Sequence, residues 1–135
     1  GSDQFGVDDK GYYVGNVIFG DVKDEMRVAK EEIFGPVMSL LRFSDYDEVI
    51  KRANATEYGL AAMVFSSNLN TVNYASRALK AGSIWVNCYG INDPSLPFGG
   101  YKHSGFGKTN SEYCLTNYLQ VKAVTQLLTN DGGWY

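Results

Sequence analysis

The stretch LAAMVFSSNLNTVNYASRALKAGSIWV, residues 60–86, decides the fold of this chain. Residues 60–65 form a short apolar run without a polar face, which predicts a strand buried on both sides. After Asn70, expected to cap a helix, apolar residues recur at helical spacing: Val72, Ala75, Ala78 and Leu79. Gly82 stands where a C-cap glycine would, and residues 83–86 read SIWV, a second strand.

The preceding segment repeats the same alternation. Residues 14–19 and 37–43 are β-branched or loosely alternating runs, and both are predicted to be strands. Residues 24–32 favour a short helix, and residues 45–55 have apolar residues at helical spacing. Strands that alternate with helices predict an α/β fold, a largely parallel sheet with flanking helices joined by right-handed crossovers.

Two further patterns concern the start of the helix over 45–55 and the elements after residue 110. Ser44, with Asp47 three residues later, imitates a capping box before the helix over 45–55. After a long loop, residues 111–118 are expected to be helical and residues 119–127 to form a last strand. Four residues of that strand share one face, namely Leu119, Val121, Ala123 and Thr125. We expect that face to be exposed or to meet a partner.

Composition excludes several classes of protein. The 135 residues are 44% apolar with a net charge of −3, and they lack the basic stripe that nucleic-acid binding requires. No apolar run approaches the roughly 20 residues that span a bilayer, and the start lacks signal-peptide features. The cytosol or an organelle matrix is therefore the expected compartment. Cys88 and Cys114 fit no metal motif and are expected to be reduced.

The glycine-rich loop over residues 87–108 is the natural place for chemistry, because it follows a strand of a parallel sheet. Its end, GFGKT, superficially resembles a P-loop, but Lys102 stands where the first glycine should be. The only histidine, His103, is interpreted as a solvated loop residue. Cys88 is interpreted as a small buried residue, because no base or cation accompanies it in sequence.

Six blocks of this sequence resemble the aldehyde dehydrogenase superfamily, in the order in which that family carries them. The two most specific are KEEIFGPVM at residues 30–38 and PFGGYKHSGFG at residues 97–107. The other four are GYYVGNVIFGDV, ATEYGLAAMVFS, AGSIWVNCYG and YLQVKAVT. The chain departs from the family at Lys108 and Thr109, where the family has arginine and glutamate, and at Cys114, where glycine is usual.

The resemblance implies roles for individual residues in an intact enzyme that uses NAD or NADP. Glu32 would bind the nicotinamide ribose hydroxyls, and Phe34 would pack beside the nicotinamide. Gly90, Ile91, Asn92 and Phe98 would border the aldehyde substrate. The last strand, residues 119–127, would join the sheet of a neighbouring subunit, so a homo-oligomer is expected. No residue of the chain is assigned a metal or a catalytic role.

The resemblance also implies that sequence upstream of this chain would supply other parts of the enzyme. The motifs of the family's nucleophilic cysteine and general-base glutamate are absent, as is the main cofactor domain. We therefore expect a carboxyl-terminal part that is inactive alone and binds no cofactor tightly. Residues 3–118 would be partial catalytic domain, 119–128 the oligomerisation strand and 129–135 a tail, with Gly1 and Ser2 set aside as a tag remnant. The alternative function is a non-catalytic binding or oligomerisation module.

Overall fold

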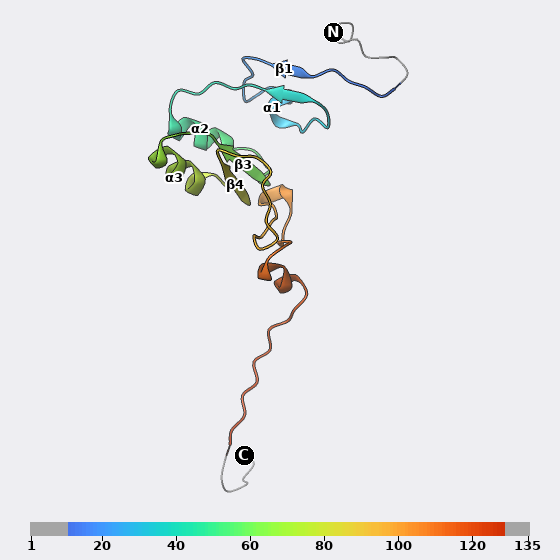
Figure 1. Cartoon of the computed structure of the whole chain (residues 1–135), viewed down its shortest axis with the longest axis vertical. Helices are drawn as coiled ribbons and strands as arrows, with labels where there is room; N and C mark the ends of the chain where they lie inside the picture. The colour runs from blue at the N-terminus through green and yellow to red at the C-terminus, as the bar shows by residue number, and fades with distance from the viewer. Residues whose placement is uncertain (1–10, 129–135) are drawn as a thin grey trace.

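Residues 11–128 are described by a computed structural model (Figure 1). Two parallel strand pairs organise them. Strand β1 (Val17–Phe19) pairs with β2 (Val37–Ser39), and β3 (Ala61–Val64) pairs with β4 (Ser83–Val86). The helices lie between the strands in sequence: α1 (Arg27–Lys30), α2 (Tyr46–Ala53) and α3 (Leu69–Ala78). Parallel strands joined through helices confirm the α/β fold class, although the strands form two pairs rather than one sheet.

The unit β3–α3–β4 contains the predicted strand, helix and strand. Ala61 lies opposite Ser83, and the parallel register continues to Val64 and Val86. The helix begins earlier than predicted, because Asn68 and not Asn70 is its N-cap. The Asn68 side chain accepts from the N–H groups of Asn70 and Thr71, two donors that the first turn would otherwise leave unpaired.

Gly82 has a different role from the predicted C-cap. Helix α3 ends at Ala78 with Leu79 as the C-cap residue, so the chain is already extended before Gly82. The Gly82 N–H donates to the carbonyl of Gly59 at 3.0 Å, which starts the β3–β4 ladder. The glycine is therefore needed for a close backbone approach and not for ending the helix.

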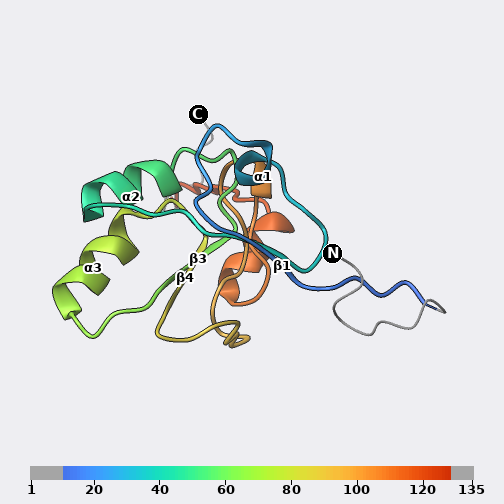
Figure 2. The same ribbon diagram turned by 90° about the horizontal axis from the view of Figure 1, so that it is seen from above.

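Helix α2 has its capping box one residue later than predicted. The N-cap is Asp45, whose carboxylate accepts from the Glu48 N–H at 2.8 Å. Glu48 reaches back and accepts from the Ser44 N–H at 2.8 Å. Figure 2 shows α2 and α3 on the same side of the β3–β4 pair. Asn54 holds their ends together, because its side chain bonds the backbone of Ala78 and Lys80.

The unit β1–α1–β2 is shorter than its sequence pattern suggests. The strand predicted over 14–19 pairs only over Val17–Phe19, and the strand over 37–43 only over Val37–Ser39. The helix predicted over 24–32 is reduced to Arg27–Lys30. Beyond the three-residue ladder, the Leu40 N–H still donates to the Phe19 carbonyl at 2.8 Å and the Val22 N–H to the Leu40 carbonyl at 3.1 Å. Each strand has only one partner in this pair, so the ladder ends there.

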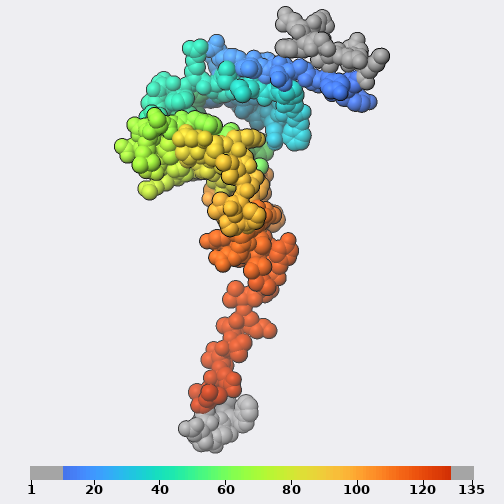
Figure 3. Space-filling view, viewed as in Figure 1, coloured from blue at the N-terminus to red at the C-terminus, as the bar shows by residue number. Residues whose placement is uncertain are grey.

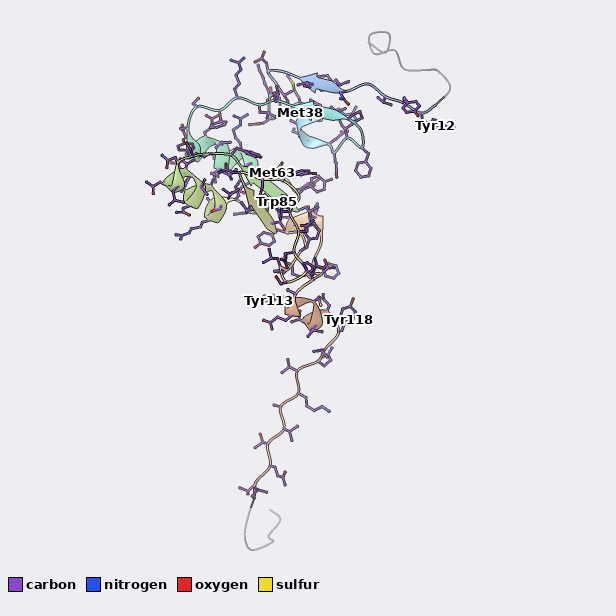
Figure 4. All side chains as sticks on the ribbon, in the orientation of Figure 1. Tyr12, Met38, Met63, Trp85, Tyr113 and Tyr118 are labelled. Atoms are coloured by element: carbon purple, nitrogen blue, oxygen red, sulfur yellow. The ribbon has the colours of Figure 1, made fainter. Side chains whose placement is uncertain are left out.

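The described residues contain very little buried core. Val22, at 5% exposure, is the one buried apolar residue among them. The chain exposes 11907 Å², whereas a folded monomer of 14.9 kDa would expose about 7000 Å². The prediction that residues 60–65 are buried on both sides is therefore wrong for this chain, since Met63 is 47% and Phe65 67% exposed. Figure 4 shows Met63 and Trp85 on the adjacent strands β3 and β4.

The carboxyl-terminal part differs most from the prediction. Residues 111–118 form a 3₁₀ helix, Glu112–Asn117, in place of an α-helix. Residues 119–128 run away from the body as an extended arm, without a strand partner within residues 11–128 (Figure 3). A strand needs a neighbour's N–H and C=O groups, so the strand predicted over 119–127 is not formed within the chain. The division of the chain at residue 118 stays a prediction, and the tail lies outside the described residues.

Candidate functional site

The turn between α1 and β2 carries Glu32 and Phe34. The Gly35 N–H donates to the Ile33 carbonyl at 2.9 Å, and the Val37 N–H donates to the Gly35 carbonyl at 2.8 Å. These two bonds close a tight turn immediately before the β1–β2 ladder. The Phe34 ring is 92% exposed, so both of its faces are available for a planar group. Glu32 is exposed and makes no hydrogen bond or ion pair with the residues that the structure describes.

The neighbouring carboxylate, Glu31, is engaged. It forms a bidentate pair with Arg27 across one helical turn, with N–O distances of 2.9 and 2.7 Å. The hydrogen bond from Arg27 lowers the pKa of Glu31. The two adjacent glutamates, which look equivalent in sequence, thus differ in whether Arg27 binds their carboxylate. Glu31 is bonded to Arg27, and the Glu32 carboxylate has no hydrogen-bond or ion-pair partner among the described residues.

Tyr58 relates this turn to the second strand pair. The pKa of Tyr58 is raised, first by the charge of Glu57 and by burial, and further by the charge of Glu32. Tyr58 lies three residues before β3. The charge of Glu32 therefore acts on Tyr58, although β2 and α2 separate the two residues in sequence.

The first part of the loop after β4 holds three of the predicted substrate residues. Asn87 begins it with a φ of 53° and bonds the backbone of Ser66 through both side-chain atoms, at 2.9 and 3.0 Å. The Trp85 indole N–H donates to the Ile91 carbonyl at 2.9 Å. Gly90, with a φ of 67°, permits the turn. Gly90, Ile91 and Asn92 are exposed near the carboxyl end of β4.

The second part of the loop returns to the opposite end of the strands. The Tyr101 N–H donates to the Gly59 carbonyl at 2.8 Å, and the Ser104 hydroxyl accepts from the Gly59 N–H at 2.9 Å. Gly59 precedes β3, so residues 101–104 lie at the amino end of that strand. The loop is therefore long enough to run from the carboxyl end of β4 back along the pair to the amino end of β3.

Phe98 lies where the loop crosses back, and it is half-buried. It forms an antiparallel bridge with Thr109: each residue's N–H donates to the other's carbonyl, at 2.9 and 2.8 Å. The structure brings Gly90, Ile91 and Asn92 together as one turn. It places Phe98 on a separate, internally bonded part of the loop.

Two lysines hold this loop, Lys102 and Lys108, and the sequence analysis assigned neither of them a structural role. The Lys102 ammonium donates to the carbonyls of Asn54 and Thr56 at 3.0 and 2.8 Å. The Lys108 ammonium donates to the carbonyls of Gly99 and Gly100 at 2.8 and 3.3 Å. For Lys108 the signal would have been a lysine among glycines, whose carbonyls have no side chain to shield them. Lys102 donates to Asn54 and Thr56, more than 40 residues away, so its role has no local signal.

No reaction centre is evident in the described part of the chain. Cys88 and Cys114 are free and half-buried. His103 is a solvated loop residue as predicted, with a side chain that is 73% exposed and lies 3.2 Å from the Glu57 carboxylate. Residues 11–128 hold no group of three or more His, Cys, Asp or Glu side chains that could bind a metal. None of their helices is long and apolar enough to cross a membrane.

Comparison with known protein families finds one match. The model of the aldehyde dehydrogenase family matches residues 1–124, which includes Gly1 and Ser2. The chain is 58% identical over 134 residues to "Aldehyde dehydrogenase family 2 member B4, mitochondrial" of Arabidopsis thaliana, covering 99% of this chain and 24% of that protein. It is 55% identical over 130 residues to "Benzaldehyde dehydrogenase, mitochondrial" of Antirrhinum majus, covering 96% of this chain and 24% of that protein. The first alignment leaves out a single residue of this chain, so it extends into the segment after residue 128.

Solved structures agree with the sequence relatives. An aldehyde dehydrogenase of Bacillus cereus in complex with NAD+ superposes with a TM-score of 0.83 at 47% identity, over 87% of this chain and 24% of that one. An indole-3-acetaldehyde dehydrogenase of P. syringae, in complex with NAD+ and IAA, gives a TM-score of 0.75 at 48% identity, over 78% of this chain and 21% of that one. The chain thus spans about a quarter of the length of the proteins it matches.

Proposed function

This chain belongs to the aldehyde dehydrogenase family, and on that premise we propose that it supplies the carboxyl-terminal part of an enzyme that oxidises an aldehyde to a carboxylic acid with NAD or NADP. The observation that carries the proposal is a match that runs through nearly the whole chain at 58% identity. The free Glu32 carboxylate two residues from the exposed Phe34 ring supports it.

The residues of the α1–β2 turn fit a nicotinamide nucleotide. Glu32 offers a carboxylate that can accept from two neighbouring ribose hydroxyls, and Phe34 offers an exposed aromatic face. When bound, the nucleotide accepts a hydride from the substrate. Neighbours in complex with NAD+ favour NAD over NADP. The role of this chain is to bind and orient, because the family's nucleophile and base motifs are not in its sequence.

The loop after β4 would border the aldehyde. Gly90, Ile91 and Asn92 present an exposed turn whose position is held by Trp85, and Phe98 offers a half-buried ring. Gly90, Ile91 and Phe98 are small or apolar, and such groups exclude water from a reacting carbonyl without reacting themselves.

Complementation tests the proposal. The chain alone is expected to have no dehydrogenase activity and no tight cofactor binding. Mixed with the complementary upstream part of a close relative, it should restore aldehyde-dependent formation of NADH. A complex that assembles and remains inactive would count against the enzyme function and favour the non-catalytic binding module.

The arm over residues 119–128 supports a homo-oligomer. Its side chains are exposed, with Val121 at 104%, and its backbone has no ladder partner within residues 11–128. Such an arm completes its hydrogen bonds by adding to the sheet edge of another subunit. In the intact enzyme, Val121→Lys should shift the oligomer toward smaller species in light scattering, whereas Lys122→Met on the opposite face should not. An unchanged assembly would exclude this contact.

The cytosol or an organelle matrix is the proposed compartment. The relatives from Arabidopsis thaliana and Antirrhinum majus are both named mitochondrial, which favours the mitochondrial matrix. Fractionation of cells that express the intact protein would decide between the two compartments.

A further inference from the structure

Three backbone segments come into close contact at Gly82, Gly99 and Gly107. The last two of these glycines belong to the glycine-rich loop that holds Phe98. A Cβ on Gly82 would lie 1.7 Å from the Gly99 carbonyl oxygen, and a Cβ on Gly99 would lie 2.5 Å from the Gly107 carbonyl oxygen. The segments therefore lie backbone against backbone at these glycines, with the Lys108 side chain beside them. Glycines offer no side chain for packing, so polar contacts with their backbone groups help to hold the segments together.

Lys108 is the side chain placed to do so. Its half-buried ammonium donates to the carbonyls of Gly99 and Gly100 at 2.8 and 3.3 Å, and it lies 4.9 Å from the centre of the Tyr101 ring. Two carbonyl dipoles and an aromatic face all favour a cation at this point. The backbone of Lys108 is held in turn, because its carbonyl accepts from the Asn117 side chain at 2.8 Å.

The same contacts determine where Phe98 lies. Phe98 directly precedes Gly99, and Thr109 directly follows Lys108. The backbone bridge between Phe98 and Thr109 is therefore next to the ammonium bonds on the same two segments. Without the ammonium, the two segments would be joined here by the two bonds of this bridge and by the bond from the Thr109 hydroxyl to the Phe98 carbonyl at 3.2 Å.

We propose that Lys108 is a positioning residue, which fastens the glycine-rich loop so that Phe98 is held against the aldehyde. This inference rests on the proposed function for the place of Phe98. Lys108 touches no substrate and acts through the carbonyls of Gly99 and Gly100.

The test uses Lys108→Met in the intact enzyme, a substitution that keeps the length of the side chain and removes its charge. We expect the amide hydrogens of Phe98 and Thr109 to exchange about tenfold faster or more, because charge-assisted bonds are lost. We expect kcat/KM for aldehyde to fall by about tenfold, while the KM for NAD changes by less than about twofold. Lys108→Arg should restore both properties. Lys51→Met, the same change on the exposed face of α2, should alter neither.

Two results would overturn the proposal. One is unchanged exchange at Phe98 and Thr109 together with unchanged kinetics. The other is an equal loss toward aldehyde and NAD with a lower melting temperature, which would show a general structural role. If Lys108→Met does not fold, Tyr101→Leu keeps the ammonium and removes the ring, and it should give a smaller effect in the same direction. If the wild-type enzyme formed no NADH in the presence of aldehyde, the proposed function would be overturned. The contact between Lys108 and the glycine-rich loop would still be tested by amide exchange at Phe98 and Thr109.

Discussion

Single residues in this chain are distinguished by whether their polar groups are already used. Glu31 and Glu32 are neighbours of one chemistry, yet Arg27 occupies the first and leaves the second available. Lys102 and Lys108 are engaged in the same way as Glu31, since each donates to two backbone carbonyls. A side chain that bonds its own protein stabilises the fold. One that does not is the better candidate for a ligand.

The residue scale therefore predicts different outcomes for two matched substitutions in the intact enzyme. Glu32→Gln should raise the KM for NAD by about tenfold or more, because a neutral amide replaces a charged acceptor at the ribose. Glu31→Gln should change that KM by less than about twofold, because its carboxylate is bonded to Arg27. Steady-state kinetics with varied NAD measures both. Equal effects of the two variants would contradict the assignment of Glu32.

A glycine pair gives a second prediction at this scale. Gly82→Ala would place a methyl group 1.7 Å from the Gly99 carbonyl oxygen, so backbone must move. We expect a loss of about 1–3 kcal/mol, the usual cost of overpacking. Gly20→Ala is the control, because a Cβ at Gly20 would meet nothing within 4 Å. Denaturant unfolding of the intact enzyme measures the difference, and equal midpoints for the two variants would show that the close contact is not maintained.

Elements in this chain depend on capping bonds and ladders more than on buried faces. Helix α2 begins with a reciprocal pair of bonds among Ser44, Asp45 and Glu48. Arg52 then joins Glu48 to Asp24, with N–O distances of 2.7 and 2.8 Å, and so ties α2 to the segment before α1. Helices of this length are marginal alone, so such bonds decide whether they form.

This network predicts a pH dependence of helix α2. The Ser44 N–H, and after it Arg52, lower the pKa of Glu48 from its ordinary value of 4.5. A lowered pKa in the folded state means that the stabilisation is complete above pH 4.5 and is lost as the pH falls through the folded value. At neutral pH, Glu48→Gln should therefore lower the amide protection of residues 46–53, and its difference from wild type should vanish in acid. Glu25→Gln, outside α2, should show no such difference. A gap that persists in acid would contradict the network.

At the scale of the whole molecule, the chain leaves most of its apolar surface uncovered. Its exposed area of 11907 Å² exceeds that of a folded monomer of its mass by more than half. The exposed apolar residues come from β1, β2, β3 and the arm, for example Ile18, Met38, Met63 and Val124. Surface of this extent on a soluble chain marks an interaction site or a liability to aggregate.

We therefore expect the isolated chain to self-associate. Open strand edges and exposed apolar faces favour pairing or exchange of elements between copies. Size-exclusion chromatography with light scattering should show species larger than 14.9 kDa. A monodisperse monomer with a cooperative thermal transition would contradict this expectation, because it would require a core that residues 11–128 do not contain in this structure.

The sequence by itself determined the fold class, the order of the elements up to β4 and the family. Periodicity and turn residues act over a few neighbours, so strands such as Ser83–Val86 could be predicted with their bounds. Motifs such as EIFGP are equally local, which is why Glu32 and Phe34 could be named as candidates. The N-caps of α2 and α3 were found within two residues, because Ser, Asp and Asn compete for the same role.

Tertiary structure alone decided what the long loop and the arm do. The return of residues 101–104 to Gly59 depends on bonds between residues more than 40 apart, which no local pattern contains. The roles of Lys102 and Lys108, and the choice between Glu31 and Glu32, follow from which groups lie within reach of one another. The strand expected over 119–127 is absent for the same reason: a sequence can favour an extended backbone, but only a neighbouring backbone makes it a strand.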